Sequence, residues 1–359
     1  MAMSRRECIK KLAYALLSAQ SFLVPGTALA QVDQSDAEQA DWQAWKDAFL
    51  TTDGRVVDHQ QNNASHSEGQ GYGMVLAVWF GDADAFRCMQ AWTIRFLAVR
   101  QDPLLAWRWQ PNQTPHIADY NNASDGDLFY AWALLGASHK FGDRAYAAQA
   151  VRIAHFLAES CIRPDPRGGA RLLLLPGAER FAVGDKVIVN PSYYMPLALR
   201  DLGAAADVQE LLRCADDGEA LLAEVAATGL VPDWIEIGPN GWSPASDRSP
   251  QSGYDALRTA LFLIWSGKPQ HLAVRRAATL YPSSTPPIIT VTDLSGQEVI
   301  ATSDLPGYAA LASLVRCANG SPLGDVFFPL TQLQPYYPAT LQLFCKIAAR
   351  QEELACGRV

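Results

Sequence analysis

The stretch SEGQGYGM, residues Ser67–Met74, places one acidic side chain among three glycines, directly ahead of the apolar run 75–80. Such an apolar run predicts a buried helix. Ser67 and Gln70 have the spacing of a capping box, so we expect Ser67 to be the N-cap and Glu68 to be the first helical residue. The carboxyl group then lies at the mouth of the helix, where glycines without a Cβ would let a bulky ligand approach.

A similar arrangement occurs a second time. The sequence NNAS precedes Glu68 at residues 62–65, and it recurs at 121–124, directly before Asp125 and the apolar run 128–135. Ser124 and Asp127 again have capping-box spacing. Each acid alone can be explained by the helix dipole, which stabilises negative charge in a first turn. Because glycines, tryptophans and asparagines surround both acids, we expect the two helices to present them on one face.

Residues 1–30 are predicted to be a cleaved export signal. Basic residues at positions 5–11 form its n-region, 12–24 its apolar core, and Ala28-Leu29-Ala30 a cleavage site. Ser4-Arg5-Arg6 also resembles a twin-arginine signal, so the export route stays open. We expect a periplasmic or secreted protein whose mature chain, 31–359, is a single domain that does not stay in the membrane.

The 359-residue chain has a formal net charge of −8, and loss of the signal, with its four cations and one anion, leaves about −11. This acidity argues against nucleic acid or an anionic membrane surface as a partner. Six cysteines remain in 31–359, without CxxC or zinc-site spacing. We expect them to fill the core, while an oxidising compartment leaves a Cys345–Cys356 disulfide, or another pair, open.

Apolar residues recur at helical spacing along most of the chain, whereas strand-like alternation is scarce. The predicted helices are 40–50, 70–80, 84–99, 127–139, 144–161, 193–202, 207–227, 254–266, 270–280, 306–318 and 338–355. Small β excursions are predicted in 172–189 and 288–300, the second with a hairpin turn at 294–296. The two NNAS units lie 59 residues apart and nothing else repeats at that distance, which favours a closed barrel of helical hairpins over a solenoid.

A third acid stands ahead of an apolar helix. Asp255 lies in the sequence GYDALR, residues 253–258, and Arg258 follows it at i+3. As a surface pair these two would contribute only about 0.2–0.5 kcal/mol. The long loops also carry Trp107, Trp109, Trp234 and Trp242. Flat aromatic faces, groups that bind hydroxyls and paired carboxyls are what hydrolysis of a polysaccharide requires, so the sequence predicts such a site.

Four separated motifs carry a resemblance to a known family. They are SEGQGYGM at 67–74, ASDGDLFYAWALLGASHKF at 123–141, NPSYYMP at 190–196 and SGYDALR at 252–258. Together they resemble glycoside hydrolase family 8, and most closely its periplasmic cellulases that are encoded with bacterial cellulose synthases. The resemblance implies an all-α fold, an (α/α)6 barrel of about twelve helices, and endo-acting hydrolysis of β-1,4-glucan with inversion.

The resemblance also assigns roles. It makes Glu68 the general acid and Asp255 the general base. The residues that it assigns to substrate binding are Asp125, Tyr254, Arg258, Trp107 and Tyr194. It implies no cofactor and no metal. The expected partners are a β-1,4-glucan substrate and, through the related operons, the cellulose synthase complex.

Proton transfer adds a constraint. Glu68 must hold a proton to donate it, although a helix N-terminus favours the charged form. We therefore expect the pKa of Glu68 to be raised by aromatic burial and by an ionised Asp125. Inversion also needs room for a water molecule, so the carboxyls of Glu68 and Asp255 should lie roughly 6.5–9.5 Å apart.

The sequence also bears on functions other than glucan hydrolysis. The glycines at 69–73 do not have G-x-G-x-x-G spacing after a strand, which argues against a nucleotide loop. Asp58, His59 and His66 lack a regular metal-binding motif. A polysaccharide lyase would need a cationic cleft. A glucan-binding scaffold without activity stays open, as do chitosan and xylan as substrates within the family.

Overall fold

The computed structural model describes residues 36–321, 329–330, 334–352 and 354. The predicted export signal, residues 1–30, and Cys356 lie outside these ranges. In the described part the chain is built mainly from eleven α-helices, α2 to α12, and ten short strands. None of the described helices is long and apolar enough to cross a membrane.

Five helices are buried nearly all round and form most of an inner layer. They are α3 (Ser67–Trp79), α5 (Ser124–Phe141), α9 (Leu257–Trp265), α11 (Pro306–Ala318) and α12 (Tyr336–Gln351). Helix α7 (Pro196–Ala206) continues this layer between α5 and α9, which it contacts on either side. Since a helix that is apolar all round needs protein on every side, these segments require an outer layer.

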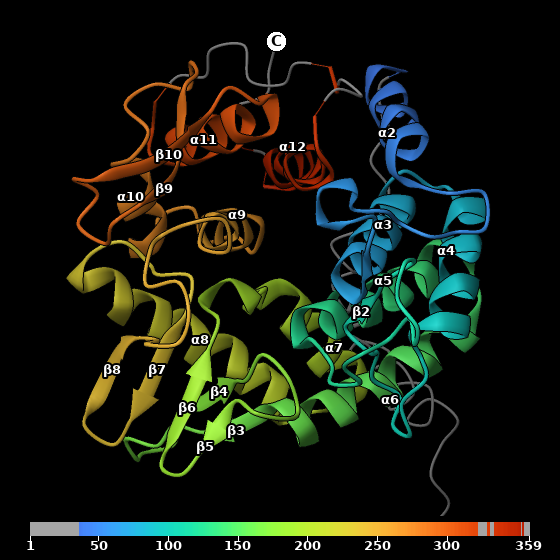
Figure 1. The fold of residues 1–359 in the computed structure, drawn as a ribbon, viewed down its shortest axis with the longest axis horizontal. Coiled ribbons are helices and arrows are strands. Elements are labelled where there is room, and N and C mark those ends of the chain that lie inside the picture. Colours follow the sequence, from blue (N-terminus) through green and yellow to red (C-terminus); the bar gives the residue numbers. More distant parts are fainter. Residues whose placement is uncertain (1–35, 322–328, 331–333, 353, 355–359) are drawn as a thin grey trace, which may run out of the picture.

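The outer layer consists of amphipathic helices that each bury one stripe. They are α2 (Asp36–Phe49), α4 (Ala83–Phe96), α6 (Arg144–Cys161), α8 (Gln209–Thr228) and α10 (Leu272–Ala278). From α2 to α11 outer and inner helices alternate along the chain, and α12 follows α11 as a further inner helix. Successive helices pack as hairpins, such as α3 with α4 and α5 with α6. The last helix returns to the first, because α12 contacts α2 and the two lie close together in Figure 1.

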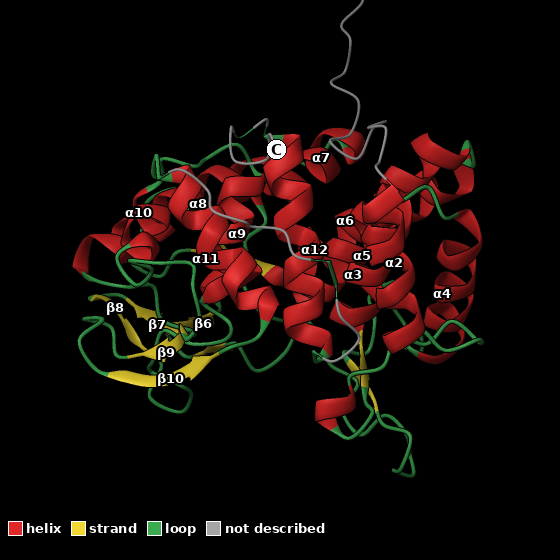
Figure 2. Cartoon of the chain, turned by 90° about the horizontal axis from the view of Figure 1, so that it is seen from above, coloured by secondary structure: helices red, strands yellow, loops and turns green. Residues whose placement is uncertain are grey.

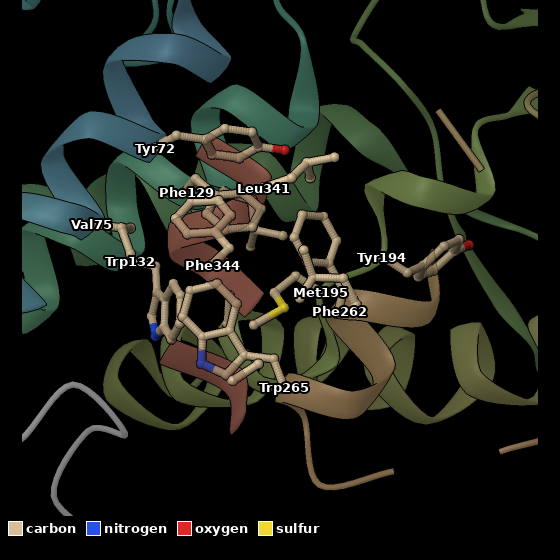
Figure 3. Close-up of a cluster of buried hydrophobic side chains, with 14 of the residues drawn as sticks. Tyr72, Val75, Phe129, Trp132, Tyr194, Met195, Phe262, Trp265, Leu341 and Phe344 are labelled. Carbon is tan, nitrogen blue, oxygen red and sulfur yellow. The ribbon is translucent and has the colours of Figure 1, made fainter. Parts of the chain in front are cut away.

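The centre of the inner layer is filled by aromatic side chains from helices far apart in the sequence (Figure 3). The ring of Tyr72 on α3 lies 4.7 Å from Phe129 on α5 and 4.9 Å from Phe344 on α12, centroid to centroid. The ring of Trp265 on α9 lies 5.0 Å from Phe344. The hydrophobic effect thus joins four helices around one point, and edge-to-face geometry adds to it.

Strands and long loops gather on one side of the helices, as Figure 2 shows. The sheets pair β1 (Ser65–His66) with β2 (Arg108–Trp109), β3 (Ile162–Pro164) with β4 (Leu172–Leu174), and β9 (Ile288–Thr292) with β10 (Val299–Ser303). A four-stranded antiparallel sheet has the order β5 (Ala182–Val183), β6 (Lys186–Val189), β7 (Ile235–Gly238), β8 (Gly241–Pro244). Both predicted β excursions are confirmed, whereas β1, β2, β3, β7 and β8 were not predicted.

All eleven predicted helices are present, but both predicted capping boxes are wrong. Ser67 is the first helical residue, and the N-cap of α3 is His66. The side chain of Gln70 accepts from the backbone N–H of Val56 at 2.6 Å and donates to Thr93 Oγ1 at 2.9 Å. Ser124 likewise donates to the carbonyl of Leu175. In both helices, polar groups of neighbouring segments compete successfully with the helix's own N–H groups.

The glycines of the first motif serve helix packing. A Cβ on Gly71 would lie 3.0 Å from Phe129 Cβ and from the Tyr130 backbone nitrogen, and a Cβ on Gly126 would lie 2.7 Å from the Glu68 nitrogen. Helices α3 and α5 therefore approach each other more closely than side chains at these positions allow. The expectation that the glycines make room for a ligand is wrong, because protein atoms fill the space.

The expectation that the cysteines fill the core is confirmed for three of them. Cys161, Cys214 and Cys345 are buried free thiols. Because Cys345 carries a free thiol, the suggested Cys345–Cys356 disulfide is wrong. Among the cysteines that the structure describes, Cys317 takes part in a disulfide.

We predict that Gly126→Ala lowers the free energy of unfolding by about 1–3 kcal/mol, because the new methyl group overlaps the start of α3. Gly69→Ala is the matched control: each glycine is the third residue of its helix, but a Cβ on Gly69 meets its nearest neighbour at 3.4 Å. This control should gain up to about 1 kcal/mol from helix propensity. Denaturant unfolding measures both, and equal effects would contradict the packing argument.

Candidate active site

The N-terminal ends of α3 and α5 bring two acids to the same place. Glu68 is the second residue of α3 and Asp125 the second residue of α5. Asp255 lies two residues before α9 begins. The predicted convergence of helix ends on one face is therefore correct for the first two acids, and the third joins them from the opposite part of the inner layer.

One guanidinium links all three acids. Arg258 Nη1 forms an ion pair with Glu68 Oε2 and lies 3.8 Å from Asp125 Oδ2, while its Nη2 lies 2.7 Å from Asp255 Oδ1. The Arg258 side chain is only 3% exposed. It also donates to Ser192 Oγ at 2.9 Å and to the hydroxyl of Tyr72 at 3.3 Å. Arg258 therefore fixes the positions of the carboxyls relative to one another.

The shared guanidinium limits how far apart the predicted acid and base can be. Glu68 and Asp255 bind adjacent nitrogens of Arg258. Two oxygens bound to one guanidinium lie no more than about 8 Å apart, given ordinary hydrogen-bond lengths and the planar fork. This limit overlaps the range of roughly 6.5–9.5 Å that inverting glycosidases use.

The acids open into a continuous trough made of three adjoining cavities of about 290, 210 and 470 Å³. Glu68, Asp255 and Arg258 line both the middle and the largest cavity. Trp107 and Tyr193 line both the middle cavity and the cavity of about 290 Å³. Since neighbouring cavities share lining residues, the three form a row with the acids in its middle part.

Burial controls the charge of these acids. The pKa of Glu68 is raised, chiefly by burial, with a further increase from Asp255, although Arg258 opposes it. Burial together with the Glu68 charge raises the pKa of Asp125 to about 8, again against Arg258. The expectation that Asp125 is ionised while Glu68 alone is protonated is therefore wrong. A single cation cannot neutralise three carboxylates in a buried site, so protons remain bound near neutral pH.

Two of the predicted substrate-binding aromatics line the trough. Trp107 lies in the wall next to Glu68, and Tyr254 lies in the largest cavity with its side chain 48% exposed. Tyr194, in contrast, is a core residue. It is fully buried, and its hydroxyl accepts from the Leu174 backbone N–H at 2.9 Å. Tyr193 takes the place at the trough that was predicted for Tyr194.

Sequence reasoning also missed residues that hold the loop before α9. The carboxylate of Asp233 accepts from the backbone N–H groups of Gly253 and Ala256, both at 2.9 Å, on either side of Asp255. Tyr337 of α12 donates its hydroxyl to the carbonyl of Tyr254. Asp233 stands 20 residues before Gly253, and no local pattern links the two. The signal that could have pointed to Asp233 is its place directly before Trp234, in a loop that also carries Trp242.

In the part of the chain that the structure describes, no group of His, Cys, Asp and Glu side chains is arranged to hold a metal ion. His59 instead hydrogen-bonds Asn63 Oδ1 at 2.8 Å. Asp58 accepts from the backbone N–H groups of Gln60 and Gln61 in a short 3-10 turn.

A family model described as glycosyl hydrolases family 8 matches residues 1–348. The chain belongs to glycosyl hydrolase family 8. The predicted family is therefore confirmed, and with it the enzyme class, a glycoside hydrolase.

Relatives of this family 8 protein are endoglucanases. The endoglucanase of Cellulomonas uda is 34% identical over 242 residues, which are 67% of this chain and 66% of that protein, so the chain spans about two thirds of that relative. A probable endoglucanase of Novacetimonas hansenii is 32% identical over 329 residues, 89% of this chain and 93% of that one. The predicted activity class, endo-acting glucan hydrolysis, agrees with these names.

The solved structure of the endo-β-1,4-glucanase CMCax from Acetobacter xylinum matches with a TM-score of 0.76 at 30% identity, covering 89% of this chain and 99% of that one. This match, together with the alternating inner and outer helices of the family 8 protein, confirms the predicted (α/α)6 barrel.

We predict that Asp125→Asn becomes more stable relative to the wild type as pH rises from about 4 to 8. In this window the folded wild type holds a proton on Asp125 that the unfolded chain has released, because the folded pKa is about 8. Stability is then lost as pH rises, by up to about 1.4 kcal/mol per pH unit for each retained proton, and asparagine removes this loss.

Denaturant unfolding at pH 5, 6.5 and 8 measures the difference. Asp84→Asn is the control, since the Asp84 side chain is 93% exposed and lies outside the trough. A constant difference between Asp125→Asn and the wild type across these pH values would contradict the buried, proton-retaining Asp125.

Proposed function

We propose that this family 8 enzyme hydrolyses internal β-1,4-glucosidic bonds of cellulose or a related β-glucan with inversion, with Glu68 as general acid and Asp255 as general base. The observation that carries the proposal is that Glu68 and Asp255 line one trough and bind the two terminal nitrogens, Nη1 and Nη2, of the same buried arginine. Two carboxyls at this spacing across a cleft suit attack by water from one face and protonation from the other.

The environment of Glu68 suits a proton donor. Its burial raises its pKa, so the carboxyl keeps a proton at a pH where an exposed glutamate has lost it. Arg258 opposes this effect in the free enzyme. When a sugar enters and the Arg258–Glu68 contact lengthens, the pKa of Glu68 rises further, because the main charge that lowers it has moved away.

The environment of Asp255 suits a base. Its side chain is 33% exposed and lies at the wall of the largest cavity, where water can reach it. Arg258 Nη2 stabilises the carboxylate at 2.7 Å, and Asp233 holds the backbone on both sides. A water molecule bound to Asp255 can then lose a proton to it while attacking the anomeric carbon.

Asp125 and the aromatic walls suit the holding of the sugar at the cleavage point. With a pKa of about 8, Asp125 presents a hydroxyl group that can donate a hydrogen bond to a sugar oxygen near neutral pH. The Trp107 ring offers an apolar face for a sugar ring on one side of the acids, and Tyr254 offers one on the other. Arg258 can donate to hydroxyls once the substrate has displaced part of its ion pairs.

We also propose that residues 1–30 export the protein, that 31–359 acts as one catalytic domain in the periplasm or outside the cell, and that it works alongside a cellulose synthase complex. The relatives' glucanase names favour glucan over chitosan and xylan. The disulfide at Cys317 suits an oxidising compartment.

We predict that Glu68→Gln lowers the rate of carboxymethylcellulose hydrolysis by about 10²–10⁴-fold, because glutamine cannot donate the proton. Binding of cellopentaose, measured by calorimetry, should stay within about threefold, since the side chain keeps its shape. The matched control is Glu210→Gln, which changes an exposed glutamate in the first turn of α8 and should leave the rate unchanged. Near wild-type hydrolysis by Glu68→Gln would show that the acid is misassigned.

Asp255→Asn should likewise remove turnover, because the attacking water loses its base. Added azide, a nucleophile that needs no base, should restore bond cleavage and yield the inverted glycosyl azide. Proton NMR of the first products of the wild type should show inversion at the anomeric carbon. Products that retain the configuration would exclude the proposed mechanism.

A further inference from the structure

His66 borders the catalytic trough without a part in the reaction proposed above. It is the last residue before α3, and in the β1–β2 ladder it pairs with Arg108. Its side chain lines the middle cavity together with Glu68, Trp107 and Asp125. His66 therefore borders the space between the Trp107 ring and the acid that a sugar chain would occupy.

The hydrogen-bonding capacity of His66 is unused. The residue is only 8% exposed, and its Nε2 is buried without a partner. Within the ranges that the structure describes, neither ring nitrogen forms a hydrogen bond. A buried polar group without a partner is unfavourable, and native proteins leave few such groups. At the wall of a binding cavity, an unpaired imidazole points to a ligand that completes it.

The chemistry of the ring selects the kind of ligand. Burial lowers the pKa of His66 to about 4, helped by Arg108 and opposed by Asp58, so the ring is neutral near pH 7. A neutral imidazole has one N–H donor and one acceptor nitrogen. A sugar hydroxyl, which both donates and accepts, can pair with either nitrogen, whereas a carboxylate can only accept and an ammonium can only donate.

The orientation of the ring is fixed. The imidazole is nearly parallel to the Trp107 indole, with an interplanar angle of 10° and 6.4 Å between the ring centroids. This separation exceeds that of a direct face-to-face stack, so the rings are offset. The backbone of Ser67 donates to the carbonyl of Trp107 at 3.0 Å and holds the two segments together. A ring held in this way can bind a hydroxyl with little loss of side-chain entropy.

We propose that His66 is a substrate-binding residue whose imidazole hydrogen-bonds a hydroxyl of the sugar that lies between Trp107 and Glu68. This inference rests on the proposed function, because it takes the ligand to be a neutral glucan chain. It assigns His66 to orientation of the chain and not to proton transfer.

The test compares two substitutions in the Glu68→Gln background, in which cellopentaose binds without being cut. His66→Phe keeps a flat ring but removes both nitrogens, whereas His66→Gln keeps one donor and one acceptor. Calorimetry should show that Phe weakens cellopentaose binding about fivefold, the effect of one neutral hydrogen bond, and that Gln restores it to within about twofold. The control is His155→Phe on the exposed side of α6, which should leave affinity unchanged.

In the active enzyme, His66→Phe should raise KM about fivefold while kcat and its pH profile stay unchanged. Equal affinity of His66→Phe and its parent would overturn the role. An equal loss of cellopentaose affinity in the His66→Phe and His66→Gln variants, together with a lower unfolding midpoint, would also overturn it. The ring would then serve packing and not binding. Failure of the proposed function appears separately, as cellopentaose cleavage by Glu68→Gln with the wild-type His66.

Discussion

The site depends on one buried cation that is shared by three carboxyls. Arg258 contacts Glu68, Asp125 and Asp255, all of which line the middle cavity of the trough. Coulomb attraction in a buried site is strong, but one positive charge can balance only one negative charge. The remaining carboxyls must hold protons or lie nearer to water. The three acids differ in burial, since the side chain of Asp125 is 3% exposed, that of Glu68 22% and that of Asp255 33%.

The barrel provides the positions that this arrangement needs. Glycines at 71 and 126 let α3 and α5 pack closely, so the second residue of each helix points into the same space. The aromatic side chains of Tyr72, Phe129 and Phe344 fill the centre directly beneath and keep the helix ends from shifting (Figure 3). Rigid helices thus hold Glu68 and Asp125, while a loop held by Asp233 presents Asp255. The least buried acid stands on the least regular element.

Much of this could be predicted from the sequence, because helix periodicity and acids ahead of apolar runs are local patterns. The helix 144–161 was predicted with its observed ends. Predictions failed where a side chain bonds to a distant segment. Gln70 bonds Val56 and Thr93 instead of capping its helix, and Tyr194 turns to Leu174 while Tyr193 faces the trough. The raised pKa of Asp125 was missed for the same reason, since burial and the sharing of Arg258 arise only when three helices meet.

The last helix closes the ring and also reaches the trough. Trp45 on α2 donates to Thr340 on α12 at 3.0 Å across nearly the whole chain, and Tyr337 on α12 bonds the backbone of Tyr254 beside the predicted base. Contacts between such distant segments form late and slow the folding of a chain. During synthesis, a ribosome-bound chain that ends before Tyr337 already contains every acid of the site but cannot complete the wall around them. The loop that carries Asp255 therefore loses part of its support whenever α12 is missing, since Tyr337 holds the backbone carbonyl next to that acid.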